Sequence, residues 1–427
     1  MGRIERIDAY QVLDGRGDPT LEVVVGLAGG AEGSAIVPSG RSKGKHEALE
    51  LRDGDQGVFG GKGVHRAASN VKGRIAQELV GLEGRSQAQL DSLLVELDGT
   101  RDFSNLGANA AVGVSMAFSR ACAAEAAVPL YEYLNPPGPH ELPMPMVSII
   151  GGGLHADNPL EFQDFLVVPV GASSFSESIH MAWRVRTAAG EIVRQMGHPL
   201  LVGDGGGYAP PLRSNRLAAE LVLRAIERAG YRPGEDLSLA FDMAANHFRR
   251  GEMYLVDGNP MPMDQYSALL KEWMAAFPIV SMEDPFDEED VGSWSAFTGE
   301  VGAQVQLVGD DLFVTNPDRL ASGVETHLAN AILVKPNQIG TLTQTVRVIE
   351  QAKAANYGVV VSIRSGETED AFISDLAVAF SAGQIKLGSL ARSSRVAKFN
   401  QLLRIEHRMG KGATFAGRSR LRGSTLP

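Results

Sequence analysis

Short apolar runs that end in a charged residue recur along the C-terminal part of this 427-residue chain. Each run has the length and apolar content of a strand that is buried on both faces. The runs end, in chain order, at Asp242, Glu283, Asp310, Lys335, Arg364 and Lys386. Segments with helical periodicity, such as 264–276 and 341–355, lie between them. This alternation predicts a barrel of strands and helices, with the charged residues gathered at one rim, where such barrels build their active sites.

The residues before 138 lack this alternation, and we expect them to form a separate unit. A chain of this length exceeds one ordinary core, so we expect an N-terminal α+β domain at 1–137 and a barrel domain at 138–427. The segment PPGPH, at 136–140, marks the boundary. The N-terminal unit is predicted to hold a hairpin of 4–13 and 20–27, helices near 64–82 and 87–97, and an Ala-rich helix at 109–125 capped by Ser104.

Composition excludes several classes of protein. The net charge of −11 argues against nucleic acid as a partner. No apolar run reaches the roughly 18 residues that a transmembrane helix needs, and the first residues carry charges where a signal peptide needs an apolar core, so we expect a cytoplasmic protein without membrane contact. The single cysteine, Cys122, lies in an apolar helical context that is typical of a buried small side chain rather than a nucleophile.

Long motifs in the chain resemble the enolase family. They are LDGRGDPTLEV, SGRSKGKHEALELRDG, LGANAAVGVSMAFSRA, GGGLHADN, SMEDPF, GDDLFVTNP, KPNQIGTLTQT, RSGETED and ARSSRVAKFNQLLRIE. The resemblance covers nearly the whole chain. It implies an α/β fold, an enolase-like modified (β/α)8 barrel with an N-terminal α+β domain. It also implies a magnesium-dependent site between the domains for a phosphorylated three-carbon acid, usually in a homodimer.

Three acids are the candidate metal ligands. Asp242, Glu283 and Asp310 end successive predicted strands, and three convergent carboxylates repel one another unless a cation joins them. Carboxylate oxygens at a rim suit Mg²⁺, which keeps positions open for substrate oxygens. The alternative is that each acid caps a helix or pairs with a lysine. By resemblance, a second Mg²⁺, bound only with substrate, would use Ser42 in the glycine-rich loop; the alternative for that loop is a solvated turn.

Two lysines are the candidate groups at the reacting carbon. Lys335 is predicted to be the base that removes the C2 proton, because such a proton leaves only where cations stabilise the resulting dianion. The alternative is a rim lysine that pairs with Asp310. Lys386 is expected to bind the substrate carboxylate.

The resemblance supplies four further substrate contacts. Arg364 and Ser365 stand where enolases bind phosphate, and the arginine fork suits a bidentate phosphate contact. Gln163 and His155 match family positions near the carboxylate and the phosphate end. A histidine in a loop is often only a hydrogen-bonding filler, which is the alternative for His155.

The chain departs from the family on one side of the substrate. Gly205 occupies the position of the glutamate that protonates the leaving hydroxyl, and Ile363 occupies that of a histidine. Asp164 keeps a carboxylate where the family has glutamate, so Asp164 and His155 join Lys335 as candidate catalytic residues. Asp204, next to Gly205, is a weaker substitute acid because adjacent loop residues usually point in different directions.

The glycine-rich loop has gained charge. Arg41, Lys43 and Lys45 surround Ser42, where enolases carry small or uncharged residues, so Arg41 and Lys43 are candidate contacts for an additional anion. A solvated basic loop is the alternative.

The lost acid and the basic loop together favour new chemistry on a retained substrate skeleton. Within the family, this combination resembles the carboxyphosphonoenolpyruvate synthases of phosphonate and phosphinate antibiotic biosynthesis, which transfer phosphonoformate from its CMP-activated form to a three-carbon phosphoacid. Two alternatives are a phosphopyruvate hydratase with an unconventional acid and a catalytically silent enolase-like scaffold.

Overall fold

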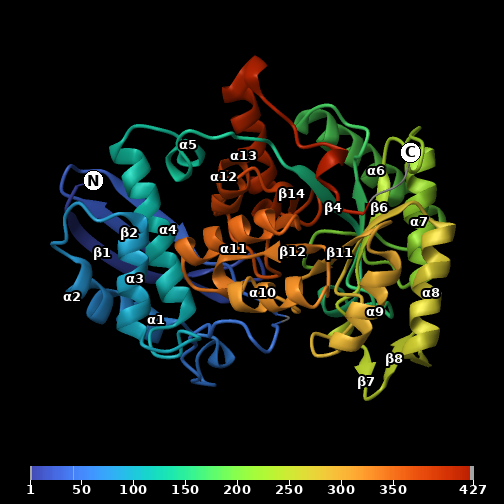
Figure 1. The fold of residues 1–427 in the computed structure, drawn as a ribbon, viewed down its shortest axis with the longest axis horizontal. Helices are drawn as coiled ribbons and strands as arrows, with labels where there is room; N and C mark the ends of the chain where they lie inside the picture. Colours follow the sequence, from blue (N-terminus) through green and yellow to red (C-terminus); the bar gives the residue numbers. More distant parts are fainter. Residues whose placement is uncertain (1, 42, 424–427) are drawn as a thin grey trace.

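The computed structural model describes residues 2–41 and 43–423, which form an N-terminal part packed against a barrel (Figure 1). The N-terminal part is built on an antiparallel sheet in the order β1-β2-β3. Its strands are β1 (Ile4–Leu13), β2 (Pro19–Leu27) and β3 (Glu32–Ile36). Leu13 pairs with Pro19 across the first turn, so the predicted hairpin is confirmed.

Helices cover one face of this sheet. They are α1 (His65–Asn70), α2 (Ala76–Leu79), α3 (Gln87–Asp98), α4 (Ala108–Glu125) and α5 (Leu130–Leu134). A π-helical turn, Val71–Ile75, joins α1 to α2. The long helix α4 packs closely on the sheet because Gly33 lacks a side chain: a Cβ at that position would lie 2.3 Å from the carbonyl oxygen of Ala117.

The predicted cap of α4 is wrong. The N-cap is Gly107, at a φ of 96°, and no side chain caps the helix. A positive φ of this kind favours glycine. The backbone amide of Ser104 instead donates to the Asp102 and Thr100 side chains, one turn before the helix begins.

The second part is a closed eight-stranded barrel in the order β10-β11-β12-β13-β14-β4-β5-β6. Its strands are β4 (Met144–Gly151), β5 (Asp164–Val168), β6 (Ser238–Asp242), β10 (Ile279–Glu283), β11 (Gln306–Gly309), β12 (Ala331–Val334), β13 (Gly358–Ser362) and β14 (Gly383–Lys386). The six predicted strands are therefore all present, and each delivers its charged residue at or just beyond its C-terminal end.

One strand runs against the others. β5 pairs antiparallel with both β4 and β6, and Asp164 at its first position lies in register with Asp242 at the end of β6. Glu283 at the end of β10 is in turn the register partner of Asp242. The reversed strand thus places Asp164 at the same rim as the two other acids.

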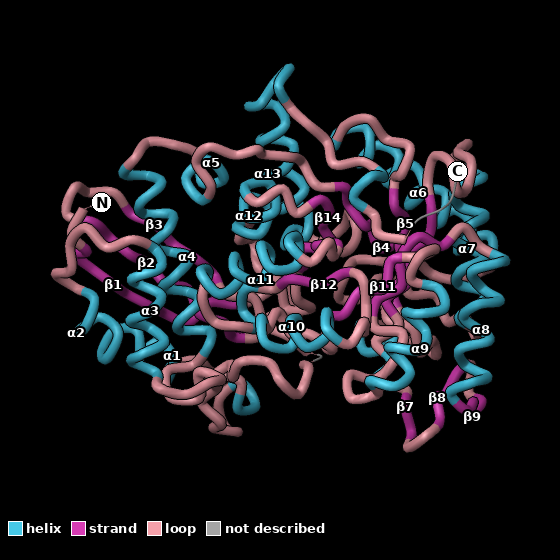
Figure 2. Tube along the Cα trace, viewed as in Figure 1, coloured by secondary structure: helices cyan, strands magenta, loops and turns pink. Residues whose placement is uncertain are grey.

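The barrel helices lie outside the strands (Figure 2). They are α6 (Phe175–Gln195), α7 (Asn215–Arg228), α8 (Met263–Ala276), α9 (Val291–Val301), α10 (Pro317–Glu325), α11 (Leu342–Ala354), α12 (Phe372–Ala379) and α13 (Ser393–Met409). A small sheet of β7 (Arg249–Arg250), β8 (Met253–Val256) and β9 (Asn259–Pro262) follows β6. Both helices predicted at 264–276 and 341–355 are confirmed.

Polar contacts hold the N-terminal part over the barrel rim. The guanidinium of Arg120 on α4 binds both carboxylate oxygens of Asp370, at 2.5 and 2.7 Å. Ser39 and Gly366 exchange backbone hydrogen bonds of 2.9 and 2.8 Å. Since Gly366 follows β13, the N-terminal loop beyond β3 is fixed above the ends of the barrel strands, where the candidate site lies.

Candidate active site

A small cavity, open to solvent, lies at the rim. Its walls come from the barrel strand ends and the loops that follow them. The lining residues are His155, Gln163, Asp164, Gly205, Asp242, Glu283, Asp310, Lys335, Ser362, Ile363, Arg364, Ser365, Lys386, Gly388 and Arg395. The structure therefore brings most of the predicted site residues into one cavity. Along the sequence these residues lie far apart, and His155 and Lys386 are separated by 231 positions.

Lys386 joins two of the acids. Its ammonium lies 2.7 Å from Asp242 Oδ2 and 2.7 Å from Glu283 Oε2, and all three side chains are buried. Burial and the neighbouring Asp242 raise the pKa of Glu283 well above its usual value. Burial alone would lower the pKa of Lys386, but the two carboxylates outweigh it and raise that pKa. Lys386 therefore serves here as the counter-ion of a carboxylate pair.

Lys335 is paired in the same way. Its Nζ lies 2.5 Å from Asp310 Oδ2, and Gln338 Nε2 donates to Asp310 Oδ1 at 3.0 Å. Burial alone would raise the pKa of Asp310, but the Lys335 ammonium outweighs it and lowers that pKa. The pairing that formed the alternative for Lys335 is thus present, and a role as base requires Nζ to leave this carboxylate.

A second group of acids lies next to the cavity. Oxygens of Asp284, Asp310 and Asp311 lie within 4.8 Å of one another. Both oxygens of Asp284 already accept backbone N–H groups, from Asp310 and Asp311 at 2.9 Å each, and only Asp310 of the three lines the cavity. Asp284 therefore shapes the turn after β11, and burial with the nearby Asp311 raises its pKa.

The residues in the cavity fit a magnesium ion. Asp242, Glu283 and Asp310 line the same cavity, and carboxylate oxygens are the ligands that Mg²⁺ prefers. Among the described acids, the group whose oxygens already lie within 4.8 Å of one another is Asp284, Asp310 and Asp311, so Asp310 belongs to both sets. Gln163 donates to Asp242 Oδ2 at 3.0 Å, while its own Oε1 is buried and accepts no hydrogen bond. A buried acceptor without a donor is costly, and a cation or a substrate N–H or O–H group would satisfy it.

The predicted phosphate-binding residues lie on the loop after β13. Arg364 donates to both oxygens of Glu47, at 2.9 and 3.1 Å, so its fork already holds a carboxylate. The hydroxyl of Ser365 accepts from the backbone N–H of Arg41 at 2.7 Å and from Arg16 at 3.3 Å. Asp14 in turn holds the Arg16 guanidinium at 3.1 Å. The turn of the predicted DGRGDP hairpin therefore supports this loop.

The side of the cavity predicted to lack its acid is sparsely filled. A Cβ at Gly205 would meet no atom within 4 Å, and Ile363 presents an apolar side chain. Asp164 accepts a hydrogen bond from Ser148, and its Oδ2 lies 3.6 Å from His155 Nδ1, which is too long for a hydrogen bond. Burial would raise the pKa of Asp164, but His155 and Lys386 lower it. Asp164 is therefore favoured as a carboxylate, a poor proton donor.

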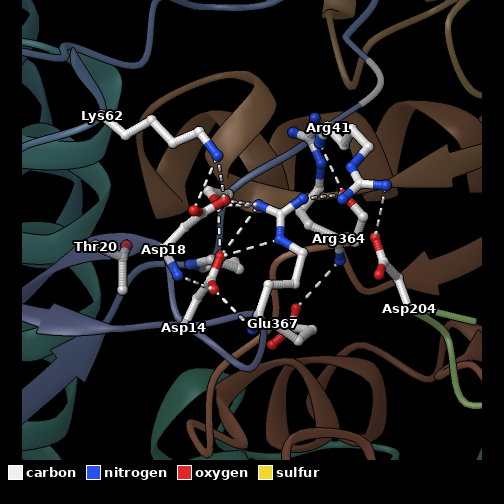
Figure 3. A network of polar contacts seen from close by, with 12 residues as sticks. Asp14, Asp18, Thr20, Arg41, Lys62, Asp204, Arg364 and Glu367 are labelled. Atoms are coloured by element: carbon white, nitrogen blue, oxygen red, sulfur yellow. Dashed lines mark hydrogen bonds and ion pairs between the residues drawn. The ribbon is translucent and has the colours of Figure 1, made fainter. Parts of the chain in front are cut away.

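The basic loop contributes less charge to the cavity than its sequence indicates. Arg41 reaches the rim, where it donates to the Leu154 carbonyl at 3.1 Å and lies 3.4 Å from Asp204 Oδ2 (Figure 3). Lys43 instead pairs with Glu50 at 2.8 Å and does not line the cavity. Ser42, the predicted ligand of a second metal ion, lies outside the described residues.

Lys45 likewise turns away from the cavity. Its ammonium lies 3.6 Å from Glu288, a buried acid on the loop after β10. Lys43 and Lys45 are therefore paired with local acids in this structure, and their contact with an additional anion stays a prediction.

Sequence reasoning missed several residues that complete the site. Glu47, Gln338 and Arg395 lie within motifs of the chain, but their contacts join segments that are far apart in sequence. The pairing of Arg364 with Glu47 spans 317 residues.

The fold and the site define a class, a (β/α)8-type barrel with a charged cavity at its rim beneath an N-terminal capping part. Comparison with protein families narrows this class. The model described as "Enolase, N-terminal domain" matches residues 4–134, and that described as "Enolase, C-terminal TIM barrel domain" matches residues 139–424. The chain therefore belongs to the enolase family.

Two further expectations concern residues outside the site. Cys122 is buried, as predicted, and burial raises the pKa of its thiol. Among the described helices, we find none with the length and apolar content needed to cross a membrane.

Proposed function

We propose that this protein is a Mg²⁺-dependent enzyme that binds 2-phosphoglycerate or phosphoenolpyruvate and transfers phosphonoformate to it from a CMP-activated form, as carboxyphosphonoenolpyruvate synthases do. One observation carries the proposal. The cavity keeps Asp242, Glu283, Lys335 and Lys386 among its lining residues, but it has open space at Gly205 and an apolar side chain at Ile363. A site that had only decayed would not be expected to keep these four charged residues together.

The retained side supplies binding and orientation. Asp242, Glu283 and Asp310 would hold the metal ion, which when bound draws negative charge away from the substrate oxygens. Lys386 faces the position of the substrate carboxylate. Arg364 faces the phosphate, where a phosphate oxygen would replace or share the contact with Glu47.

The transfer balances without an oxidant or a reductant. A phosphate oxygen of the three-carbon acid attacks the phosphonate phosphorus and forms a new P–O bond. The bond from that phosphorus to CMP breaks, and CMP leaves with the bonding electrons. Positioning supplies most of the rate in such transfers at phosphorus, which suits a site that offers cations but no general acid at Gly205.

Release of CMP tests the proposal. The protein is incubated with Mg²⁺, 2-phosphoglycerate or phosphoenolpyruvate, and CMP-activated phosphonoformate, and CMP is separated by chromatography. We expect release that depends on one of the acids and is lost in the Asp310→Ala variant. Ordinary conversion of 2-phosphoglycerate to phosphoenolpyruvate without CMP release would favour a hydratase, and binding without either reaction would favour a silent scaffold.

A homodimer in the cytoplasm, without nucleic acid or membrane partners, completes the proposal. Family resemblance supports the dimer, and the net charge of −11 supports the absence of nucleic acid. Sedimentation of the purified protein tests the dimer.

A further inference from the structure

Arg395 brings an unneutralised cation to the cavity wall. The side chain extends from α13 and is 1% exposed. One terminal nitrogen donates to the backbone carbonyls of Ser365 and Asp204, at 2.7 and 3.1 Å. The other two nitrogens, Nε and NH1, are buried and donate to no group among the described residues.

The neighbouring acids do not neutralise this guanidinium. Asp204 lies 3.4 Å from Arg41, and Glu367 pairs with Lys398 at 2.5 Å. Asp164 contacts Ser148 and lies near His155. No carboxylate of the described residues forms an ion pair with Arg395, whereas Lys335, Lys386 and Arg364 in the same cavity all have one.

Burying a charged group without an ion-pair partner is unfavourable, and arginine keeps its charge in proteins. Burial lowers the pKa of Arg395 more than the nearby carboxylates of Glu367, Asp204 and Asp164 raise it. An anionic ligand that supplied oxygen acceptors to Nε and NH1 would remove this cost.

Space for such a ligand lies beside the same residue. A Cβ added to Gly205 would meet nothing within 4 Å. Gly388 and Ile363 complete the wall, and neither carries a polar side chain. This part of the cavity therefore offers open space at Gly205, small or apolar neighbours and one cation without an ion pair.

The geometry points to a second anion subsite, formed by Arg395 and the space at Gly205, which binds an anionic oxygen of a small carboxylated phosphonate while the three-carbon acid occupies the rest of the cavity. The choice of ligand rests on the proposed function; the subsite itself rests on the unpaired guanidinium. Arg395 acts here by binding the second reactant.

Phosphonoformate itself is the probe. It is titrated by calorimetry into the full chain already saturated with Mg²⁺ and phosphoenolpyruvate. We expect saturable binding in the wild type, and binding weaker by about tenfold or more in Arg395→Met, because hydrogen bonds to a charged group are lost. The affinity for phosphoenolpyruvate alone should fall much less, because Arg395 meets that part of the site only through the Ser365 carbonyl.

A second variant keeps Arg395 and its backbone contacts intact. Gly205→Glu places a carboxylate in the open space, where it can pair with the guanidinium, so phosphonoformate binding should be lost. Gly205→Ala adds only an uncharged methyl group to this space and should weaken phosphonoformate binding far less than Gly205→Glu. Comparing Gly205→Glu with Gly205→Ala therefore tests the subsite even if Arg395→Met does not fold.

Two results would overturn the subsite: no phosphonoformate binding in the wild type, or binding that neither Arg395→Met nor Gly205→Glu weakens. Equal loss of affinity for phosphoenolpyruvate and phosphonoformate would also contradict it, because Arg395 would then belong to the three-carbon site. The proposed function is tested separately from the subsite. Phosphonoformate binding that depends on Arg395, without CMP release, would support the subsite and contradict the transfer reaction. CMP release without binding that depends on Arg395 would support the transfer reaction and contradict the subsite.

Discussion

Asp242 and Glu283 are register partners on adjacent barrel strands, and one ammonium, that of Lys386, lies 2.7 Å from an oxygen of each. The third acid, Asp310, is paired in the same way with Lys335, whose Nζ lies 2.5 Å from Asp310 Oδ2. Two ammonium groups thus contact three carboxylates at these strand ends. The acid in excess among these five groups is the physical reason to expect a divalent cation beside them.

We expect Mg²⁺ affinity to depend on the acids that line the cavity. Asp242→Asn should weaken Mg²⁺ binding by about tenfold or more, since even indirect contacts to a metal contribute that much. Asp284→Asn is the matched control, because both oxygens of Asp284 already bind backbone N–H groups. Calorimetry measures both variants. If Asp284→Asn lost Mg²⁺ affinity and Asp242→Asn kept it, the ion would be assigned instead to the group of Asp284, Asp310 and Asp311.

The basic loop offers a second matched pair. Arg41 lies at the cavity rim beside Asp204, whereas Lys43 is held by Glu50. Arg41→Gln should raise the KM for the CMP-activated reactant by about tenfold, the size of one charge-assisted hydrogen bond. Lys43→Gln should leave it nearly unchanged. Similar effects in both variants would show that the loop acts through its overall charge rather than through Arg41.

Contacts between the two parts of the chain should dominate their stability. Arg120→Met leaves the buried Asp370 without its guanidinium and should lower the free energy of unfolding by about 3–5 kcal/mol. Arg6→Met breaks the exposed pair with Glu32, where both side chains are more than half exposed, and should change it by less than about 1 kcal/mol. Urea unfolding compares the two, and equal effects would contradict the structural importance of the buried pair.

A buried acid away from the site should make stability depend on pH. Burial raises the pKa of Asp375 from 3.8 to about 6. The folded state therefore holds this proton more firmly than the unfolded chain, so stability falls as the pH rises from about 4 to about 6. Asp375→Asn should remove a penalty of about 3 kcal/mol at pH 8 and much less at pH 4. An equal effect of the variant at both pH values would refute the raised pKa.

Local patterns predicted most strands because a buried parallel strand is a short apolar run whatever its neighbours are. They did not reveal β5, since DFLVV carries its charge at the start, and the direction of a strand leaves no periodic signal. Partners of charged side chains were equally hidden. Glu50 and Glu288 neutralise Lys43 and Lys45 through folds of the chain that no spacing encodes.

For the candidate site, too, the sequence predicted which residues take part but not which groups they contact. Motif resemblance identified Lys335, Asp310 and Arg364, but the structure was needed to show that each is already paired. The absence of an acid at Gly205 was readable from the sequence. The unpaired guanidinium of Arg395 was not, because it depends on the positions of the Ser365 and Asp204 carbonyls.

The fate of 2-phosphoglycerate tests the central claim most directly. A single sample holds the protein, Mg²⁺, 2-phosphoglycerate and CMP-activated phosphonoformate, and phosphorus NMR follows every phosphorus bond over time. We predict a new phosphonate signal that grows together with CMP, and dehydration to phosphoenolpyruvate slower by about 10² to 10⁴ than with a positioned general acid, because Gly205 supplies none. Rapid appearance of phosphoenolpyruvate with the phosphonate signal unchanged would contradict the account.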